Sequence, residues 1–290
     1  MSNAKDIRSQ IKSIKSTQKI TKAMQMVAAS KMRRSQDAMQ EGRPYVENIL
    51  RVIAHLLKAR GEVAHPFFSE SDKPVKKVGY IVVSTDRGLC GGLNINLFKK
   101  LLAHVDEHNQ QGCEMQFSVF GRKGVAFVHR MNGKIVTTVD AYGDNPALRD
   151  LIGGISAMID AYRNGELDRV YLVGNRFVNT MTQEPMIMQF LPATIIRDDH
   201  YAPEYSWAYD YEPDAEQILD KLAVRYLESV VKQAVAENIA CEMSARMIAM
   251  KNASDNAANL IGELELQYNK ARQAAITQEL TEIVSGAAAV

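Results

Sequence analysis

Residues 84–94 carry the chain's best candidate for phosphate chemistry. They have the sequence Ser-Thr-Asp-Arg-Gly-Leu-Cys-Gly-Gly-Leu-Asn and follow an apolar run that favours a strand. A glycine-rich turn between a strand and a helix can bind phosphate through its backbone N–H groups. This loop lacks the Lys-Ser/Thr pair that reaches phosphate and magnesium, and Gly88, Gly91 and Gly92 do not give the GxGxxG spacing. The sequence therefore favours a tight structural turn over a nucleotide site.

A second pattern could bind a metal. His104 and His108 lie at i and i+4 in His-Val-Asp-Glu-His, which matches the H-x-x-E-H pattern of a zinc peptidase helix. No acidic third ligand on a downstream helix is evident, and the segment continues into the polar His-Asn-Gln-Gln-Gly. We therefore expect a solvated pair of histidines and no metal site.

Other reactive side chains do not form a recognisable site. Cys90, Cys113 and Cys241 are far apart and contain no CxxC pair, so we expect reduced thiols and neither disulfide nor structural zinc. Asp198 and Asp199 lie beside a histidine in a loop, and no Ser/His/Asp or Cys/His arrangement stands out. We expect no cofactor and no catalytic residues.

The elements that would position these residues follow from the helix breakers. Fifteen of the 17 glycines and all 8 prolines lie between residues 42 and 213. Two long helices should bracket a compact domain, with rods of roughly 58 Å over residues 3–41 and roughly 105 Å over residues 214–284. We assign an N-terminal coiled-coil helix to 1–60, an α/β domain to 75–195, a C-terminal coiled-coil helix to 213–285 and a small apolar tail to 286–290.

The C-terminal segment has a coiled-coil seam with alternating spacings of three and four. Its residues are Ala240, Met243, Met247, Met250, Ser254, Ala257, Ile261, Leu264, Tyr268, Ala271 and Ala275. The N-terminal stripe drifts from a strict heptad, with Ile7, Ile11, Ile14, Ile20, Met24, Val27 and Met32. We predict an antiparallel pair in which about thirty C-terminal residues extend beyond the partner helix. That amphipathic tip would enter an apolar sleeve on a partner, or fold back or fray.

Short apolar runs alternate with helical stretches in the middle of the chain. We predict strands at 78–84, 115–120, 134–139, 169–178 and 185–191, and helices at 94–109, 122–131 and 146–164. This alternation indicates a mixed α/β fold whose central domain is Rossmann-like, with a mainly parallel sheet.

Charge separates the two ends. Residues 1–43 hold ten Lys or Arg against three acids, a balance of +7, whereas residues 214–285 hold eleven acids and seven bases, a balance of −4. A basic helix can bind nucleic acid, an anionic membrane or an acidic protein, or be a solvated face neutralised by its partner. No aromatic residue in the first 43 is available for base stacking, which disfavours nucleic acid. No run approaches a membrane span and no signal peptide is visible, so we expect a cytoplasmic chain.

Three segments resemble the gamma subunit of bacterial F-type (F1Fo) ATP synthase. They are residues 17–32, residues 84–94, and residues 276–289 with the pattern I-T-x-E-x-x-E followed by G-A. The resemblance covers the whole chain in order. It implies a central rotor shaft that couples rotation of the membrane c-ring to ATP synthesis or hydrolysis at alpha and beta subunits. The chain itself would be non-catalytic and peripheral, on the cytoplasmic face of the inner membrane.

The resemblance also implies contact residues. Those implied to face an acidic lever loop of beta are Met24, Lys31, Arg33 and Arg34. Those implied to contact beta and alpha along the upper shaft are Arg246, Arg272, Gln273, Thr277, Glu279, Thr281 and Glu282. Those assigned to the epsilon subunit or the c-ring are Arg43, Tyr45 and Tyr209. The alternative is a coiled-coil adaptor or a basic-arm nucleic-acid binder.

Overall fold

The computed structural model describes residues 4–59, 65–69, 74–194 and 214–288. Its centre is β1 (Lys77–Val83), an apolar strand in which every residue after Lys77 is buried. β1 belongs to a five-stranded sheet of order β3-β2-β1-β4-β5. β2 (Glu114–Phe120), β3 (Lys134–Val139) and β4 (Arg169–Phe177) run parallel within it, and β5 (Gln183–Leu191) pairs antiparallel with β4. The sheet is therefore mainly parallel, as predicted.

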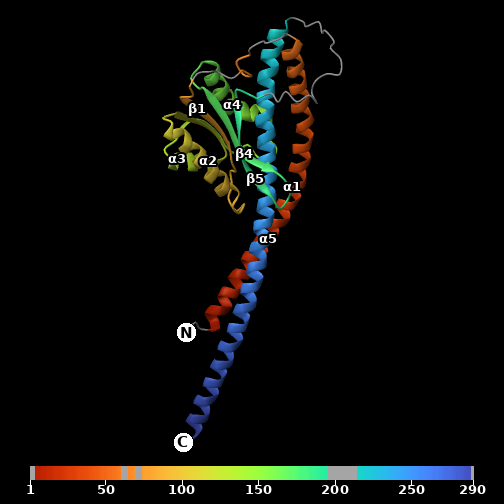
Figure 1. The fold of residues 1–290 in the computed structure, drawn as a ribbon. Coiled ribbons are helices and arrows are strands. Elements are labelled where there is room, and N and C mark those ends of the chain that lie inside the picture. Colours follow the sequence, from red (N-terminus) through yellow and green to blue (C-terminus); the bar gives the residue numbers. More distant parts are fainter. Residues whose placement is uncertain (1–3, 60–64, 70–73, 195–213, 289–290) are drawn as a thin grey trace. The chain divides into compact units, whose positions relative to one another are not determined.

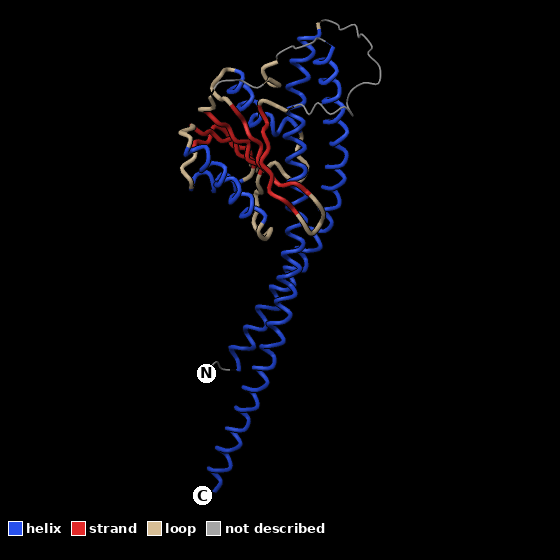
Figure 2. Tube along the Cα trace, viewed as in Figure 1, coloured by secondary structure: helices blue, strands red, loops and turns tan. Residues whose placement is uncertain are grey.

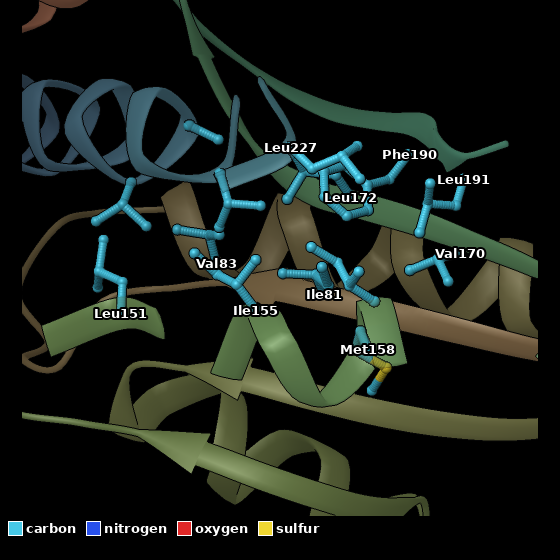
Figure 3. Packing of buried hydrophobic residues seen from close by; sticks show 14 of the residues in the cluster. Ile81, Val83, Leu151, Ile155, Met158, Val170, Leu172, Phe190, Leu191 and Leu227 are labelled. Carbon is cyan, nitrogen blue, oxygen red and sulfur yellow. The ribbon is translucent and has the colours of Figure 1, made fainter. Parts of the chain in front are cut away.

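Helices cover both faces of this sheet (Figure 2). On one face, Tyr80 and Val82 of β1 pack with residues of α2 (Leu93–Gln110) and α3 (Arg122–Arg130). On the other face, Ile81 and Val83 pack with residues of α4 (Leu148–Arg163) and α5 (Ala215–Ala288), as Figure 3 shows. Successive residues of a strand point to opposite faces, so burial of both faces requires the nearly continuous apolar run found in β1.

The predicted elements of this domain are all present, with shifted ends. The largest shift at a helix start is in α4, which was predicted from residue 146 and begins at Leu148. Asp150 accounts for the later start, because its carboxylate accepts a hydrogen bond of 3.0 Å from the backbone N–H of Ala147. A side chain that satisfies the N–H just before a helix fixes where that helix begins.

The two terminal helices are α1 (Ala4–Ala59), shown in Figure 1, and α5. Each contributes to two compact units: residues 1–29 with 246–290 form a two-helix unit, and residues 30–245 form a sheet unit. In the sheet unit, Leu227, Val231 and Val235 of α5 belong to the core on the sheet. The later part of α1 packs on the start of α5, where Ile53 and Leu219 share a smaller cluster.

The first helix is longer than its breaker-free stretch. α1 continues beyond residues 3–41, through Gly42 and Pro44, to Ala59. A proline inside a helix costs about 3 kcal/mol because it removes a hydrogen bond and clashes with the preceding turn. Burial of Ile49, Ile53 and Leu56 just beyond it supplies the compensating packing energy.

In the two-helix unit the seam of α5 follows the predicted positions as far as Ala271, but the predicted seam residue Ala275 is exposed. Met250, Ser254, Ala257 and Ile261 are buried, and Leu264, Tyr268 and Ala271 are half-buried. The helices are antiparallel, because Lys15 pairs with Glu265 at 2.7 Å and Gln18 donates to the carbonyl of Ser254 at 3.5 Å. From Arg272 to Ala287 every side chain is exposed, so the unpaired end is shorter than the thirty residues expected.

The stripe predicted on α1 was wrong in two places. Ile20 and Val27 are 58% and 56% exposed. The positions of α1 in this unit that are not exposed are residues 4, 7, 11, 14, 18, 21, 24, 25, 28 and 29. These positions follow spacings of three and four without drift. Gln18 and Thr21 can occupy seam positions because the seam of α5 has small side chains at Ser254 and Ala257, and Gln18 donates to the Ser254 carbonyl. The seam is therefore continuous, and two large apolar residues of α1 are left facing outward.

Candidate functional site

The loop after β1 bonds to itself and to its neighbours. The Ser84 hydroxyl donates to the carbonyl of Phe120 at 2.9 Å and accepts from the N–H of Gly124 at 2.8 Å. The Asn94 amide donates to the Thr85 hydroxyl at 2.7 Å, and that hydroxyl donates to the carbonyl of Arg87, also at 2.7 Å. These polar groups are therefore engaged within the protein and are not directed at a ligand.

The crevice at the carboxyl ends of β1 and β4, where open α/β sheets bind their ligands, is filled by α5. Asn175 of β4 donates to the side chain of Asn238 at 2.8 Å, and both residues are buried. Cys241 lies in one cluster with Cys90 and Leu93 of the loop region. Burial raises the pKa of the Cys241 thiol far above its usual range, which keeps the sulfur protonated and unreactive. Helix α5 thus takes the place that a nucleotide would occupy.

The histidine pair lies on α2 beside Tyr80. The Tyr80 hydroxyl is 3.0 Å from Nδ1 of His104, and Nδ1 of His108 donates to the carbonyl of His104 at 2.9 Å. Both histidines are half-buried, so the predicted solvated pair is instead packed on one side. Among the described residues, no group of three or more His, Cys, Asp or Glu side chains could hold a metal ion.

The basic residues assigned to the lever loop differ in their surroundings. Lys31 forms an ion pair with Asp144, and both side chains are about half exposed. Arg33 and Arg34 are exposed. Met24 is half-buried in the two-helix unit, whereas Met26, which was not predicted as a site residue, is 62% exposed.

Exposed residues dominate the end of α5. Arg272, Gln273 and Glu279 are exposed, and the hydroxyls of Thr277 and Thr281 donate to carbonyls one turn earlier, at 2.9 and 2.8 Å. Glu282 accepts from Gln278 at 3.0 Å. Arg246 is different, because it is only 8% exposed.

An apolar stripe accompanies these polar groups at the end of α5. Four large side chains of this stripe are between 44% and 68% exposed: Ile276, Leu280, Ile283 and Val284. Their spacing places them on one face of a helix. The sequence marks this face through its amphipathic pattern, but exposed Ile20 and Val27 of α1 were missed because their apolarity placed them in the seam. Clustered exposed apolar side chains are typical of interaction surfaces.

Of the residues assigned to the epsilon subunit or the c-ring, the structure describes two. Arg43 lies 3.7 Å from Glu237, and Tyr45 is 58% exposed beside a cavity of about 600 Å³ in the sheet unit. The cavity is lined by α1, α5 and the segment before α4, including Asp144, Arg225 and Lys232. Tyr209, and with it Asp198, Asp199 and His200, lies outside the described residues.

These features define a class of protein: a mainly parallel α/β sheet between two long terminal helices, with exposed polar and apolar side chains at the end of α5. The family profile described as ATP synthase matches residues 3–290, and the chain belongs to that family. It is 61% identical over 290 residues to the ATP synthase gamma chain of Dichelobacter nodosus and 57% identical over 291 residues to that of Acinetobacter baylyi. Both alignments cover 100% of each chain.

Solved structures share the fold. A chain of the Euglena gracilis mitochondrial ATP synthase, in an OSCP/F1/c-ring structure, matches with a TM-score of 0.67 and 18% identity over 99% of this chain and 94% of that one. A chain of the Tetrahymena thermophila central stalk/c-ring structure matches with a TM-score of 0.59 and 24% identity over 81% and 99%. Within the described residues, the helices are all too short or too polar to cross a membrane.

Proposed function

We propose that this chain is the central rotor shaft of a bacterial F1Fo ATP synthase. The observation that carries the proposal is the 61% identity to an ATP synthase gamma chain over the full length of both chains. The chain would couple proton-driven rotation of the c-ring to ATP synthesis or hydrolysis by alpha and beta subunits. It would contribute no catalytic residue and would lie at the cytoplasmic face of the inner membrane as a peripheral subunit.

The two-helix unit supports this role. Its seam is continuous and built largely from small or flexible residues such as Met250, Ser254 and Ala257, which keep two helices close together. A helix that shares a seam with a second helix frays less than it would alone, because each turn is held by packing as well as by backbone hydrogen bonds. A shaft must transmit the work of several protons, at about 2.3 kcal/mol per proton per 100 mV.

The exposed faces would provide contacts that differ with angle. A shaft with different faces turned toward three identical subunits binds each in a different way, and differential contact shifts their conformational equilibria. The tip of α5 from Arg272 to Glu282, which includes the apolar residues Ile276 and Leu280, would contact alpha and beta. Arg246, which is 8% exposed, is proposed to contact beta or alpha as well.

The remaining partner contacts are proposed for residues of α1 and for Tyr209. Met24, Lys31, Arg33 and Arg34 would face acidic residues of beta, since α1 is strongly basic. Epsilon and the c-ring would contact the region of Arg43 and Tyr45. They would also contact Tyr209, which lies outside the described residues.

Coexpression with the alpha, beta and epsilon chains tests the proposal. We expect one copy of this chain to co-purify with three alpha, three beta and one epsilon chain, and ATP-driven proton pumping to depend on it in inverted membrane vesicles. Failure to enter a stoichiometric complex would reject the shaft. Salt-dependent binding of the chain to DNA or RNA in place of assembly would favour the basic-arm alternative.

The isolated chain provides a second test. Because α5 occupies the crevice beside β1, we expect neither ATP hydrolysis nor tight ATP binding by the purified chain. Calorimetry and a phosphate-release assay measure the two properties. Sustained turnover by the chain alone would place catalysis in the sheet unit and contradict the proposal.

A further inference from the structure

His104 and His108 form a cluster that the rotor function does not use. They lie one turn apart on α2 with ring centroids 4.6 Å apart. Two buried tyrosines from the sheet lie beneath them: the Tyr171 ring packs edge-on against His104 at 4.6 Å, and the Tyr80 ring lies 5.7 Å from His104 and 6.4 Å from His108. Both imidazoles are therefore held in fixed orientations by a rigid floor.

Hydrogen bonds fix the same nitrogen of each ring. Nδ1 of His104 is bonded to the Tyr80 hydroxyl, and Nδ1 of His108 donates to the carbonyl of His104. In the described part of the chain, no hydrogen bond is formed by Nε2 of either ring, and both side chains are half-buried. A histidine that ligates a metal typically anchors its other nitrogen to a carbonyl or another fixed acceptor. The His108 ring already has that arrangement, and Nδ1 of His104 lies 3.0 Å from the Tyr80 oxygen, which can accept from it.

A carboxylate accompanies the pair. Glu107, the residue before His108, brings a negative charge that would attract a divalent ion.

We propose that His104 and His108 bind one divalent transition-metal ion through their Nε2 atoms. Imidazole pairs prefer zinc, nickel, copper and cobalt over magnesium or calcium, which select oxygen ligands. In the metal-bound site, Nδ1 of His104 would carry the ring proton and donate a hydrogen bond to the Tyr80 oxygen, which leaves Nε2 free for the metal. Water would fill the other coordination positions, because the described residues supply no third protein ligand. The site is a binding site and not a catalytic centre, and it is independent of the rotor proposal.

A titration of the full chain, purified without a polyhistidine tag, tests the site. We expect saturable binding of one Zn²⁺ per chain in calorimetry, and signals from two imidazole nitrogens in the electron paramagnetic resonance spectrum of the Cu²⁺ form. His104→Ala and His108→Ala should each weaken binding by about tenfold or more and leave one imidazole signal. Tyr80→Phe should weaken binding by a smaller factor, because it removes only the partner that orients His104.

His129→Ala is the matched control, since His129 is an exposed histidine of the neighbouring helix α3. It should bind the metal as the unmodified chain does. Circular dichroism checks that each variant is folded, and His104→Gln with His108→Gln replaces any variant that is not. Absence of saturable binding in the unmodified chain, undiminished binding in the two alanine variants, or equal weakening by His129→Ala would overturn the proposal.

Discussion

At the scale of single residues, two adjacent glycines of α4 have opposite surroundings. A Cβ on Gly154 would lie 2.7 Å from the Phe120 ring and 2.9 Å from Val139, whereas one on Gly153 would meet no atom within 4 Å. Gly154 thus permits the close packing of α4 on the sheet. Gly153 only adds backbone freedom to the unfolded chain.

Alanine at each position should therefore change stability in opposite directions. We expect Gly154→Ala to lower the free energy of unfolding by about 1–3 kcal/mol through overpacking, and Gly153→Ala to raise it by about 0.5–1 kcal/mol. Urea unfolding of both variants measures the difference. Equal effects of the two substitutions would show that contact with Phe120 does not distinguish the sites.

Tyr142 makes the stability of the folded chain depend on pH in the alkaline range. Its hydroxyl donates to the carbonyl of Ser84 at 2.9 Å, and burial, then the charges of Asp86 and Glu242, raises the pKa of the phenol well above its usual value. Above about pH 10 the unfolded chain loses this proton while the folded chain keeps it. The contribution of Tyr142 to stability is therefore complete below that pH and is lost as the pH rises.

Replacement of Tyr142 by phenylalanine should make the free energy of unfolding fall less steeply as the pH rises. We expect Tyr142→Phe to cost about 1 kcal/mol near neutral pH for the lost hydrogen bond. Between about pH 9 and 11 the gap from the unmodified chain should narrow, because the variant no longer has this ionisable group. Urea unfolding across this range measures it, with Tyr45→Phe as the exposed control. A gap that stays constant would mean that Tyr142 does not contribute to the pH dependence.

At the scale of elements, the seam of the two-helix unit distinguishes neighbouring residues. Ile261 is 8% exposed and Leu260 is 47% exposed on the same turn of α5. We expect Ile261→Ala to destabilise the unit by about 2 kcal/mol or more and Leu260→Ala by less than about 0.5 kcal/mol.

Amide hydrogen exchange over residues 246–271 reports this local stability directly. Faster exchange should follow from the Ile261 substitution and not from that of Leu260. Similar exchange rates in the two variants would mean that the seam does not hold this stretch of α5 in place.

Sequence patterns predicted the helices and strands better than they predicted which residues of different elements pack together. The seam of α5 was predicted because its spacing is strict, and the strands because their apolar runs are short and bounded by turn residues. Ile20 and Val27 were misplaced because side-chain polarity alone does not show which helix face is buried when the partner's face is small and polar. The sequence does not show what keeps the first helix intact through Gly42 and Pro44, because the packing of Ile53 on Leu219 joins residues far apart in the sequence.

The candidate site was predicted unevenly for similar reasons. Resemblance placed a set of polar residues near the end of α5, and those from Arg272 onward are exposed there. It could not show that Arg246 is largely buried or that Lys31 is paired with Asp144. The closure of the crevice by Asn238 and Cys241 was also invisible, because α5 lies far from β1 in the sequence.

At the scale of the whole molecule, function should be separable from folding. Met24 is half-buried, so Met24→Lys can direct its ammonium to solvent and should change the stability of the isolated chain little. In the proposed complex a further cation on a basic helix would alter its contacts with acidic residues of beta. We expect proton pumping per ATP hydrolysed to fall much more than the yield of assembled complex.

Pumping and hydrolysis assays on the same membranes measure this ratio, with Met24→Leu as the control of similar volume. Proportional loss of assembly and pumping would show that Met24 acts through structure alone.

The antiparallel pairing of α1 with α5 also affects how the protein is made. Lys15 and Gln18 leave the ribosome at the start of synthesis, and their partners Glu265 and Ser254 leave near its end. At about 5–20 residues per second this separation lasts roughly 10–50 seconds. During that time the nascent first helix exposes an apolar stripe with no native partner, which makes it a segment for cellular chaperones to shield until translation is complete.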